Sequence, residues 1–368
     1  MIKSDCNTIQ CTVAIDNWQT AYQYLRGENM RVTLKDIAKE TNLSVTTVSL
    51  VLNKKECRVS DSTRSLILET AEKMHYYPNQ LAVGLVKQET KTIGLIIPDI
   101  SNHFFANLAL GIDDEMLKHD RNIILSNTSD RPERDLKSIQ VLRSRGVDAI
   151  ILAMASNIDR TYIPSYKDLI NDSPIPIITV DRCNPALNCS ALKLNNKKGA
   201  YNAVSHLLSL GHKNIVCITG PANSDSTQER LAGYEWAYRD AGIPLPKKYV
   251  FHGDYLRHSG NEATKQILKE TDATAVFAFN DLMALGAYHC LRQEGLSVPD
   301  DMSIVGFDNI DFSDMLEVPL TTVNQPTYEI GREAAKRALL EISRPEAEKQ
   351  TISFEPHLII RKSTAKPR

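Results

Sequence analysis

Residues 33–53 read TLKDIAKETNLSVTTVSLVLN, and their apolar positions repeat at helical spacing on both sides of a short break. Thr33 is a good N-cap for the first helix, with Asp36 three residues on as an acidic partner. Asn42 lies at the break, where a residue that tolerates a positive φ is needed, and Ser44 can cap the second helix. The segment therefore predicts two helices joined by a tight turn.

Such a pair of helices has two interpretations. The second helix can enter the major groove of DNA and present its N-terminal side chains to base edges. An ordinary helical hairpin with no DNA role fits the same pattern equally well. The pattern alone leaves both interpretations open.

A third helix is predicted over residues 62–75, with a buried side formed by Leu66, Ile67, Leu68, Ala71 and Met74. Residues 31–77 therefore predict a three-helix headpiece. The next segment, 78–91, starts with PNQLAVGL, which is enough for about two helical turns, and then becomes polar; we interpret it as a hinge and linker. Residues 1–30 have no sustained periodicity and form an extension of unknown role, so Met30 is a candidate start of translation.

The rest of the chain alternates short apolar runs with amphipathic stretches of helical length. Strands are predicted at IGLII, NIILS, DAIILAM, IPIITV, NIVCITG, YVFHG, ATAVFAF and SIVGF. Helices are predicted near 104–119, 133–145, 161–171, 196–210, 225–241, 258–270 and 281–294. Strands with helices between them indicate parallel sheets. The two series predict an α/β domain over residues 92–368, with two doubly wound subdomains and a cleft at the carboxyl ends of their strands.

Composition and charge are those of a soluble globular protein with two or three domains. The chain has 368 residues, 42% hydrophobic and 24% charged, and a net charge of -2. Residues 31–91 carry ten Lys or Arg against seven Asp or Glu, whereas the rest of the chain is acidic. This small N-terminal excess of positive charge is expected if only that part meets phosphate.

Several classes of protein are disfavoured by what the sequence lacks. The seven cysteines are scattered singly and show no metal-ligand spacing, so we expect a reducing compartment and no metal. We find no secretory leader and no run of ~18 apolar residues, and we therefore expect a cytoplasmic protein without a membrane partner. The motifs G-x-G-x-x-G, G-x-x-x-x-G-K-[ST], G-x-S-x-G and H-E-x-x-H do not occur, so neither a cofactor nor a catalytic residue is expected and the chain is not predicted to be an enzyme.

The headpiece resembles one known family at many positions. Its residues fit the pattern T-x-x-D-V-A-x-x-A-G-V-S-x-x-T-V-S-x-V-L-N at Thr33, Asp36, Ala38, Ser44, Thr47, Val48, Ser49, Val51, Leu52 and Asn53. The match continues at Val59-Ser60, Thr63-Arg64 and Tyr77-Pro78-Asn79. This is the pattern of the lactose-repressor/galactose-repressor (LacI/GalR) family of bacterial regulators, and the resemblance covers residues 31 to about 362. It implies a transcription regulator, most simply a repressor, that binds double-stranded operator DNA.

The resemblance also implies roles for individual residues. Bases would be read by Val45, Thr46 and Leu50, and phosphates held by Thr33, Ser44, Thr47, Ser49, Asn53, Ser60, Thr63 and Arg64. Leu50 stands where many members have arginine, so we expect readout to rely on apolar contacts with thymine methyls. In the hinge, Leu85 matches a leucine that relatives wedge into the minor groove; the alternative is a buried anchor of the linker.

A second set of polar and aromatic residues lies directly after the predicted strands. Such residues suit a ligand rich in hydroxyls, which needs carboxylates, amides and arginines for its edges and aromatic faces for its ring. The set resembles the ligand residues of periplasmic ribose-binding proteins, whose fold the effector domain is similar to. The matching positions are Asn102, Phe104, Phe105, Asp181, Arg182, Arg230, Tyr255, Asn280, Asp308 and Gln325.

This second resemblance implies a pentose-like monosaccharide effector. A purine would use the aromatic residues, Arg230 and Asp308, but would have less use for Asn102, Arg182 and Gln325. Other interpretations are a periplasmic sugar-binding protein, which the headpiece and the missing leader disfavour, and an α/β enzyme. We further expect a homodimer, because one headpiece buries too little surface for operator affinity, and no tetramer, because no heptad segment follows the last strand.

Overall fold

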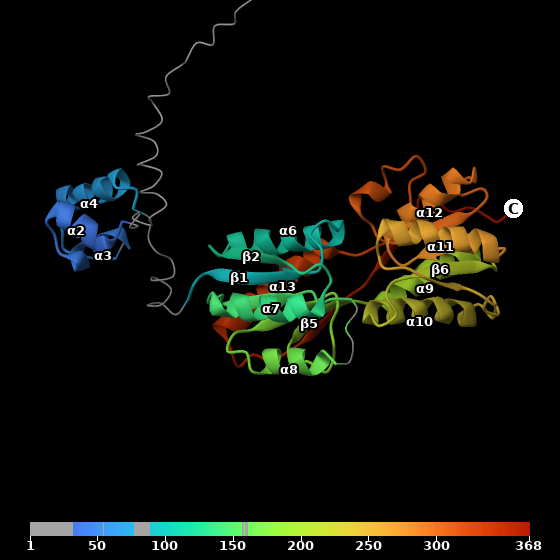
Figure 1. The fold of residues 1–368 in the computed structure, drawn as a ribbon, viewed down its shortest axis with the longest axis horizontal. Helices are drawn as coiled ribbons and strands as arrows, with labels where there is room; N and C mark the ends of the chain where they lie inside the picture. The colour runs from blue at the N-terminus through green and yellow to red at the C-terminus, as the bar shows by residue number, and fades with distance from the viewer. Residues whose placement is uncertain (1–31, 54, 77–88, 157, 159–160) are drawn as a thin grey trace, which may run out of the picture. The chain divides into compact units, whose positions relative to one another are not determined.

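The computed structural model describes residues 32–53, 55–76, 89–156, 158 and 161–368. These residues divide into an N-terminal unit and a C-terminal unit, which Figure 1 shows in blue and in cyan to red. Most of the predicted hinge, including Leu85, and the extension 1–30 lie outside the described residues.

The N-terminal unit is the predicted three-helix headpiece. Its helices are α2 (Leu34–Thr41), α3 (Val45–Leu52) and α4 (Asp61–Lys73). Asn42 takes the left-handed conformation expected at the turn, with φ 56°. Each pair of helices is in contact, and their shared core consists of Ile37, Ala38, Val48, Val51, Ile67 and Ala71.

The prediction that Leu66 and Leu68 are buried is wrong. Each of these α4 side chains is 48% exposed. Ile67 and Ala71 take the inward face, and a neighbour in sequence is rotated by about 100° around the helix axis. Leu66 and Leu68 therefore lie on either side of the face that Ile67 and Ala71 turn to the core, and the other two helices do not cover them.

The C-terminal unit contains two six-stranded sheets, each covered by helices on both faces (Figure 1). The first has the order β11-β5-β4-β3-β1-β2 and is parallel throughout. Its strands are β1 (Thr92–Ile97), β2 (Asn122–Asn127), β3 (Ala149–Leu152), β4 (Ile177–Val180), β5 (Ser190–Leu194) and β11 (Thr351–Phe354). Its helices are α6 (His103–Leu117), α7 (Pro132–Ser144), α8 (Ile163–Asn171) and α13 (Thr327–Ser343).

Alternation along β1 explains the two covered faces of this sheet. Ile93, Leu95 and Ile97 belong to the core that α6 and α13 close. Ile96, which points the other way, belongs to the core that α7 and α8 close. A strand with apolar residues on both sides must be covered twice, as the doubly wound prediction requires.

The second sheet repeats the plan in the order β12-β10-β9-β8-β6-β7. Its strands are β6 (Ile215–Thr219), β7 (Val250–His252), β8 (Ala275–Ala278), β9 (Ser303–Asp308), β10 (Thr321–Asn324) and β12 (His357–Ile359), and only β12 runs antiparallel to its neighbour β10. Its helices are α9 (Asn196–Ser209), α10 (Asp225–Asp240), α11 (Arg257–Glu270) and α12 (Asp281–Gln293), with a short 3-10 helix at Asp311–Ser313.

The chain passes between the two halves three times rather than once. It crosses after β5, again between β10 and α13, and a third time between β11 and β12. Helix α13 returns to the first half and packs on α6. Strands β5, β11 and β12 and helix α13 were not predicted from the sequence. No helix among the described residues is long and apolar enough to span a bilayer.

Candidate functional site

Eleven of the twelve predicted DNA contacts are described, and none of them is buried. Val45, the first residue of α3, is 41% exposed, and Thr46 beside it is also exposed, whereas Val48 and Val51 face the headpiece core. Leu50 is half-buried. The start of α3 is thus accessible at positions assigned to base reading. Val45 in particular is an apolar residue that the headpiece core does not bury.

Several hydroxyl groups predicted to hold phosphate lie at the first turns of α3 and α4. Ser44 Oγ accepts a hydrogen bond from Thr47 N (3.0 Å), and Ser60 Oγ accepts one from Thr63 N (3.2 Å). The first N–H groups of a helix lack internal partners and favour anions. At the start of α2, Asp36 instead accepts from Thr33 N and Thr33 Oγ1, and these bonds lower the pKa of Asp36.

The ten predicted effector residues line one cavity in the C-terminal unit, together with Ser226, which the sequence analysis did not single out. The strands place most of them. Asp181 and Arg182 directly follow β4, Asn280 follows β8, Asp308 ends β9 and Gln325 follows β10. The carboxyl ends of strands from both sheets thus contribute to the same cavity.

Three of these residues have backbones in the left-handed region, with φ 63° at Asp181, 69° at Tyr255 and 125° at Asp308. Each such conformation costs about 1 to 3 kcal/mol and persists only where the surroundings enforce it. Strain of this kind gathers at ligand sites more than elsewhere. It directs these side chains into the space where the strands end.

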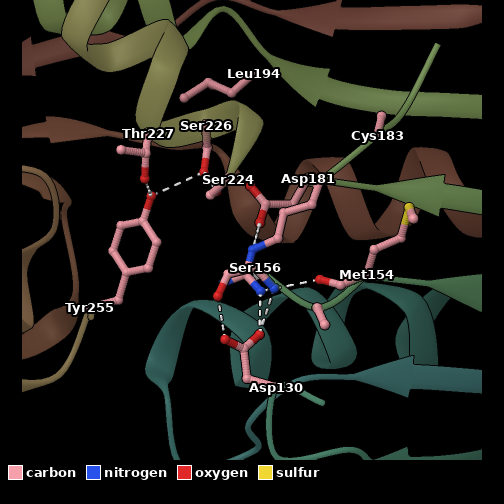
Figure 2. A network of polar contacts seen from close by, with 12 residues as sticks. Asp130, Met154, Ser156, Asp181, Cys183, Leu194, Ser224, Ser226, Thr227 and Tyr255 are labelled. Atoms are coloured by element: carbon pink, nitrogen blue, oxygen red, sulfur yellow. Dashed lines mark hydrogen bonds and ion pairs between the residues drawn. The ribbon is translucent and has the colours of Figure 1, made fainter. Parts of the chain in front are cut away.

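Aromatic rings form part of the wall. Phe104 and Phe105 meet edge to face, with centroids 4.9 Å apart. Tyr255 is held by its hydroxyl, which lies 2.7 Å from Thr227 Oγ1 and 3.1 Å from Ser226 Oγ (Figure 2). Gly220 makes room for this ring, because a Cβ there would lie 2.2 Å from Tyr255 Cζ.

Asp308 and Gln325 form a buried pair. Gln325 Nε2 donates to Asp308 Oδ1 at 2.6 Å. Gln325 is 4% exposed, yet its Oε1 has no hydrogen-bond partner among the described residues. A buried acceptor without a partner is unfavourable by about 1 to 3 kcal/mol, so a donor from a ligand would be stabilising here.

Arg230 is the positive group beside this pair. Its Nε donates to Asn196 Oδ1 (2.9 Å), its Nη1 donates to Phe279 O, and its Cζ lies 3.8 Å from the Phe307 ring centroid. Burial raises the pKa of Asp308 well above its ordinary value, with nearby Asp281 adding to the effect, and the attraction of Arg230 offsets only part of it. The Asp308 carboxyl is therefore poised to hold a proton until donors satisfy it.

The two asparagines already serve the fold. Asn102 Oδ1 caps α6 by accepting from Phe104 N (3.1 Å). Asn280 Oδ1 caps α12 by accepting from Met283 N, and its Nδ2 donates to Tyr255 O, both at 2.9 Å. Because both Oδ1 atoms already accept hydrogen bonds, the two asparagines would bind a ligand mainly through the amide N–H groups that remain free to donate.

Arg182 is held by groups of the first half of the domain. Its Nη1 donates to Asp130 Oδ1 (2.7 Å) and Met154 O (3.1 Å), and its Nε lies 3.6 Å from Asp181 Oδ2 (Figure 2). Burial raises the pKa of Asp181, against the attraction of Arg182 and Arg230. Asp130 was not predicted from the sequence, because it does not directly follow its strand as Asp181 follows β4.

The cavity is small and suits recognition by hydrogen bonds. Its volume is about 30 Å³, room for roughly two water molecules. No group of three His, Cys, Asp or Glu side chains that could hold a metal occurs in the described part of the chain. Carboxylate, amide, guanidinium and aromatic groups together match the needs of a polyhydroxylated ring.

Two family models match the chain. Residues 33–79 match the bacterial regulatory proteins of the lacI family, and residues 204–364 match a periplasmic binding protein-like domain. The chain is 37% identical to catabolite control protein A of Priestia megaterium, over 91% of this chain and all of that protein. It is 32% identical to the transcriptional repressor PurR of Aliivibrio fischeri, over 90% of this chain and 98% of that one.

Several solved structures of similar fold have a bound small molecule. A LacI family regulator from Enterococcus faecium with bound ribose has a TM-score of 0.69 and 32% identity, over 75% of this chain and all of that one. The lac repressor dimer bound to operator and an anti-inducer has a TM-score of 0.80 and 27% identity, over 91% and 99% of the two chains. These relatives are transcription regulators rather than enzymes.

Proposed function

This chain belongs to the lacI family of bacterial regulatory proteins and is a DNA-binding transcription regulator of the repressor type. From that premise we propose that a ribose-like pentose, bound in the effector cavity, controls its affinity for operator DNA. Residues 31–77 would read the operator, residues 78–91 would form the hinge, and residues 92–368 would bind the effector and a second copy of the chain.

The observation that carries the effector assignment is the state of Gln325. Its buried Oε1 has no hydrogen-bond partner in the described part of the chain. Its Nε2 donates to one oxygen of Asp308, and Arg230 lines the same cavity. An acceptor, a carboxylate and a guanidinium placed together can serve neighbouring sugar hydroxyls, which both donate and accept. The phenylalanine pair and Tyr255 supply apolar surface for the C–H faces of the ring.

Binding must move the walls of this cavity. A pentose has five carbons and five oxygens, far more than about 30 Å³ accommodates. The two halves of the domain are joined by three chain crossings and contact each other through their facing surfaces. A movement of one half away from the other is therefore the simplest way to admit a pentose. A ligand that favours one arrangement of the halves shifts the domain towards it, which is the differential affinity that control of DNA binding needs.

The ribose-bound structure from Enterococcus faecium supports a pentose, whereas the similarity to PurR supports a purine as the second candidate. The polar residues Asn102, Arg182 and Gln325 favour the sugar. A thermal-shift screen over D-ribose, other pentoses, hexoses, sugar phosphates and purines separates the two. We expect D-ribose to raise the melting temperature most; stabilisation by purines alone would overturn the assignment.

DNA recognition is proposed on the exposed start of α3. Val45 and Leu50 offer apolar surface suited to thymine methyls, and the hydroxyls at the first turns of α3 and α4 are suited to phosphates. The lac repressor structure is a dimer on its operator. We therefore propose a homodimer that reads two half-sites about one helical turn, ~10 bp, apart.

A further inference from the structure

One carboxylate beside the effector cavity has no assigned role. Asp130 follows β2, and its Oδ1 accepts from Arg182 Nη1 (2.7 Å) and from Ser156 N (2.8 Å). Its Oδ2 accepts from the Ser156 hydroxyl (Figure 2). A single side chain thus joins the segments that follow three strands of the same sheet, β2, β3 and β4, although β1 lies between β2 and β3.

The backbone that presents this carboxylate is strained. Ser129 and Asp130 are both left-handed, with φ 55° and 58°. Two consecutive residues other than glycine in this region are unfavourable by about 1 to 3 kcal/mol each. Asp130 N bonds to Pro98 O (3.2 Å) and Arg134 Nη1 to Ser129 Oγ (3.0 Å). The fold therefore maintains a costly turn whose visible result is the contact between Asp130 and Arg182.

Asp130 is one of three partners that hold Arg182, beside Met154 O and Asp181. Its side chain is 13% exposed, and its Cζ lies 5.5 Å from the Phe105 centroid and 5.9 Å from that of Tyr255, both in the cavity wall. A long flexible side chain reaches one such position reproducibly only when fixed partners hold it. Burial tends to lower the pKa of Arg182, but Asp130 and Asp181 outweigh it and raise that pKa.

Asp130 also determines the charge balance of the site. Arg182 and Arg230 are the two arginines that line the cavity, and Asp181 and Asp308 are its two carboxylates. Asp130 adds a carboxyl group in direct contact with Arg182. Burial tends to raise the pKa of Asp130, but the attraction of Arg182 and the hydrogen bonds from Ser156 outweigh it and lower that pKa, in contrast to Asp181 and Asp308. An anionic ligand would therefore meet an arginine whose charge is already neutralised.

We propose that Asp130 is a positioning and specificity-determining residue of the effector cavity: it fixes the Arg182 guanidinium towards the ligand and neutralises it, so that the site selects a neutral sugar over its phosphate ester. This inference rests on the proposed sugar-binding function.

The test compares Asp130→Asn with wild type and with Asp120→Asn. Asp120 is a matched control, because it is also left-handed (φ 55°) and ion-paired, with Lys91 Nζ at 2.5 Å, but it precedes β2 at the opposite end of the strand. Titration calorimetry measures binding of D-ribose and of D-ribose 5-phosphate to the full-length protein, and melting curves verify folding.

We expect Asp130→Asn to weaken D-ribose binding about tenfold, the loss typical of one charge-assisted hydrogen bond. The preference for ribose over its phosphate should fall by about tenfold or more, because a negative charge has gone. Ser156→Ala should shift both quantities in the same direction by less, and Asp120→Asn should shift neither. A well-folded Asp130→Asn protein with wild-type affinity and preference would overturn the inference, as would equal changes in Asp120→Asn.

A second measurement needs no sugar. Phenylglyoxal modifies accessible, deprotonated arginine, and peptide mass spectrometry reads out Arg182 specifically. We expect modification several-fold faster in Asp130→Asn than in wild type or Asp120→Asn. If the wild-type protein binds no sugar, the proposed function fails, but the rate of Arg182 modification still tests whether Asp130 positions Arg182. Equal modification rates in all three proteins would refute that positioning role.

Discussion

Asp308→Asn should weaken D-ribose binding by about tenfold to a hundredfold while leaving the effector domain folded. The change removes the group that can become a carboxylate when a ligand binds, without changing size, and asparagine shares with aspartate the tolerance of positive φ that this position needs. A hydrogen bond to a charged group contributes about 1.5 to 3 kcal/mol, and each 1.4 kcal/mol is tenfold in affinity. Asp308→Ala should lose at least as much, because Gln325 Nε2 then loses its acceptor.

The pH dependence distinguishes this mechanism from a general loss of packing. Burial raises the pKa of Asp308 in the folded protein, so the folded state holds a proton there that the unfolded chain releases. That contribution to stability is present below the ordinary aspartate pKa near 3.8 and is lost as pH rises through the raised value. Asp308→Asn does not titrate, so at neutral pH it should be no less stable than wild type. Wild-type affinity for ribose should rise with pH over the same interval, and that of the variant should not.

Calorimetric titration at several pH values, with melting curves, provides the measurement. Asp240→Asn is the control, an exposed aspartate that accepts from Tyr201 OH at 2.6 Å on the surface of the same half. Unchanged ribose affinity in a folded Asp308→Asn protein would refute the role of Asp308. A lower melting temperature with a normal ligand response would show that Asp308 only stabilises the turn after β9.

Three further outcomes are expected. Leu85→Ala should weaken operator binding in a mobility-shift assay and leave ribose affinity unchanged; equal loss of both would mean that the segment is not a DNA-wedging hinge. Val45→Ala should change operator preference at a stability cost under about 0.5 kcal/mol, whereas Val48→Ala, in the headpiece core, should cost about 2 kcal/mol in denaturant unfolding. Sedimentation should show a dimer at micromolar concentration, and a monomer or a stable tetramer would contradict the proposed assembly.

Features encoded by neighbouring residues were predictable from the sequence. The N-cap at Ser44 and the left-handed turn at Asn42 depend on side chains a few positions away. The series of strands up to β9 follows from runs of apolar residues that must be covered on both faces. The cavity residues Asp181, Asn280 and Asp308 were predictable for a related reason. Parallel strands end at a shared edge of the sheet, so the residues at and just after their carboxyl ends lie close together.

The remaining features depend on contacts between distant segments. Helix α13 packs on α6, and Leu66 faces solvent. Local periodicity predicts neither feature, because both depend on how distant elements pack against each other. Asp130, in the loop after β2, and Ser226, in the first turn of α10, acquire their neighbours only when segments 26 or more residues apart converge. The raised pKa of Asp308 depends likewise on burial and on Asp281, against the attraction of Arg230. The sequence by itself thus determined the elements and most residues of the cavity, whereas only the tertiary structure decided their partners and charges, because electrostatic and hydrogen-bond energies depend on distances in space.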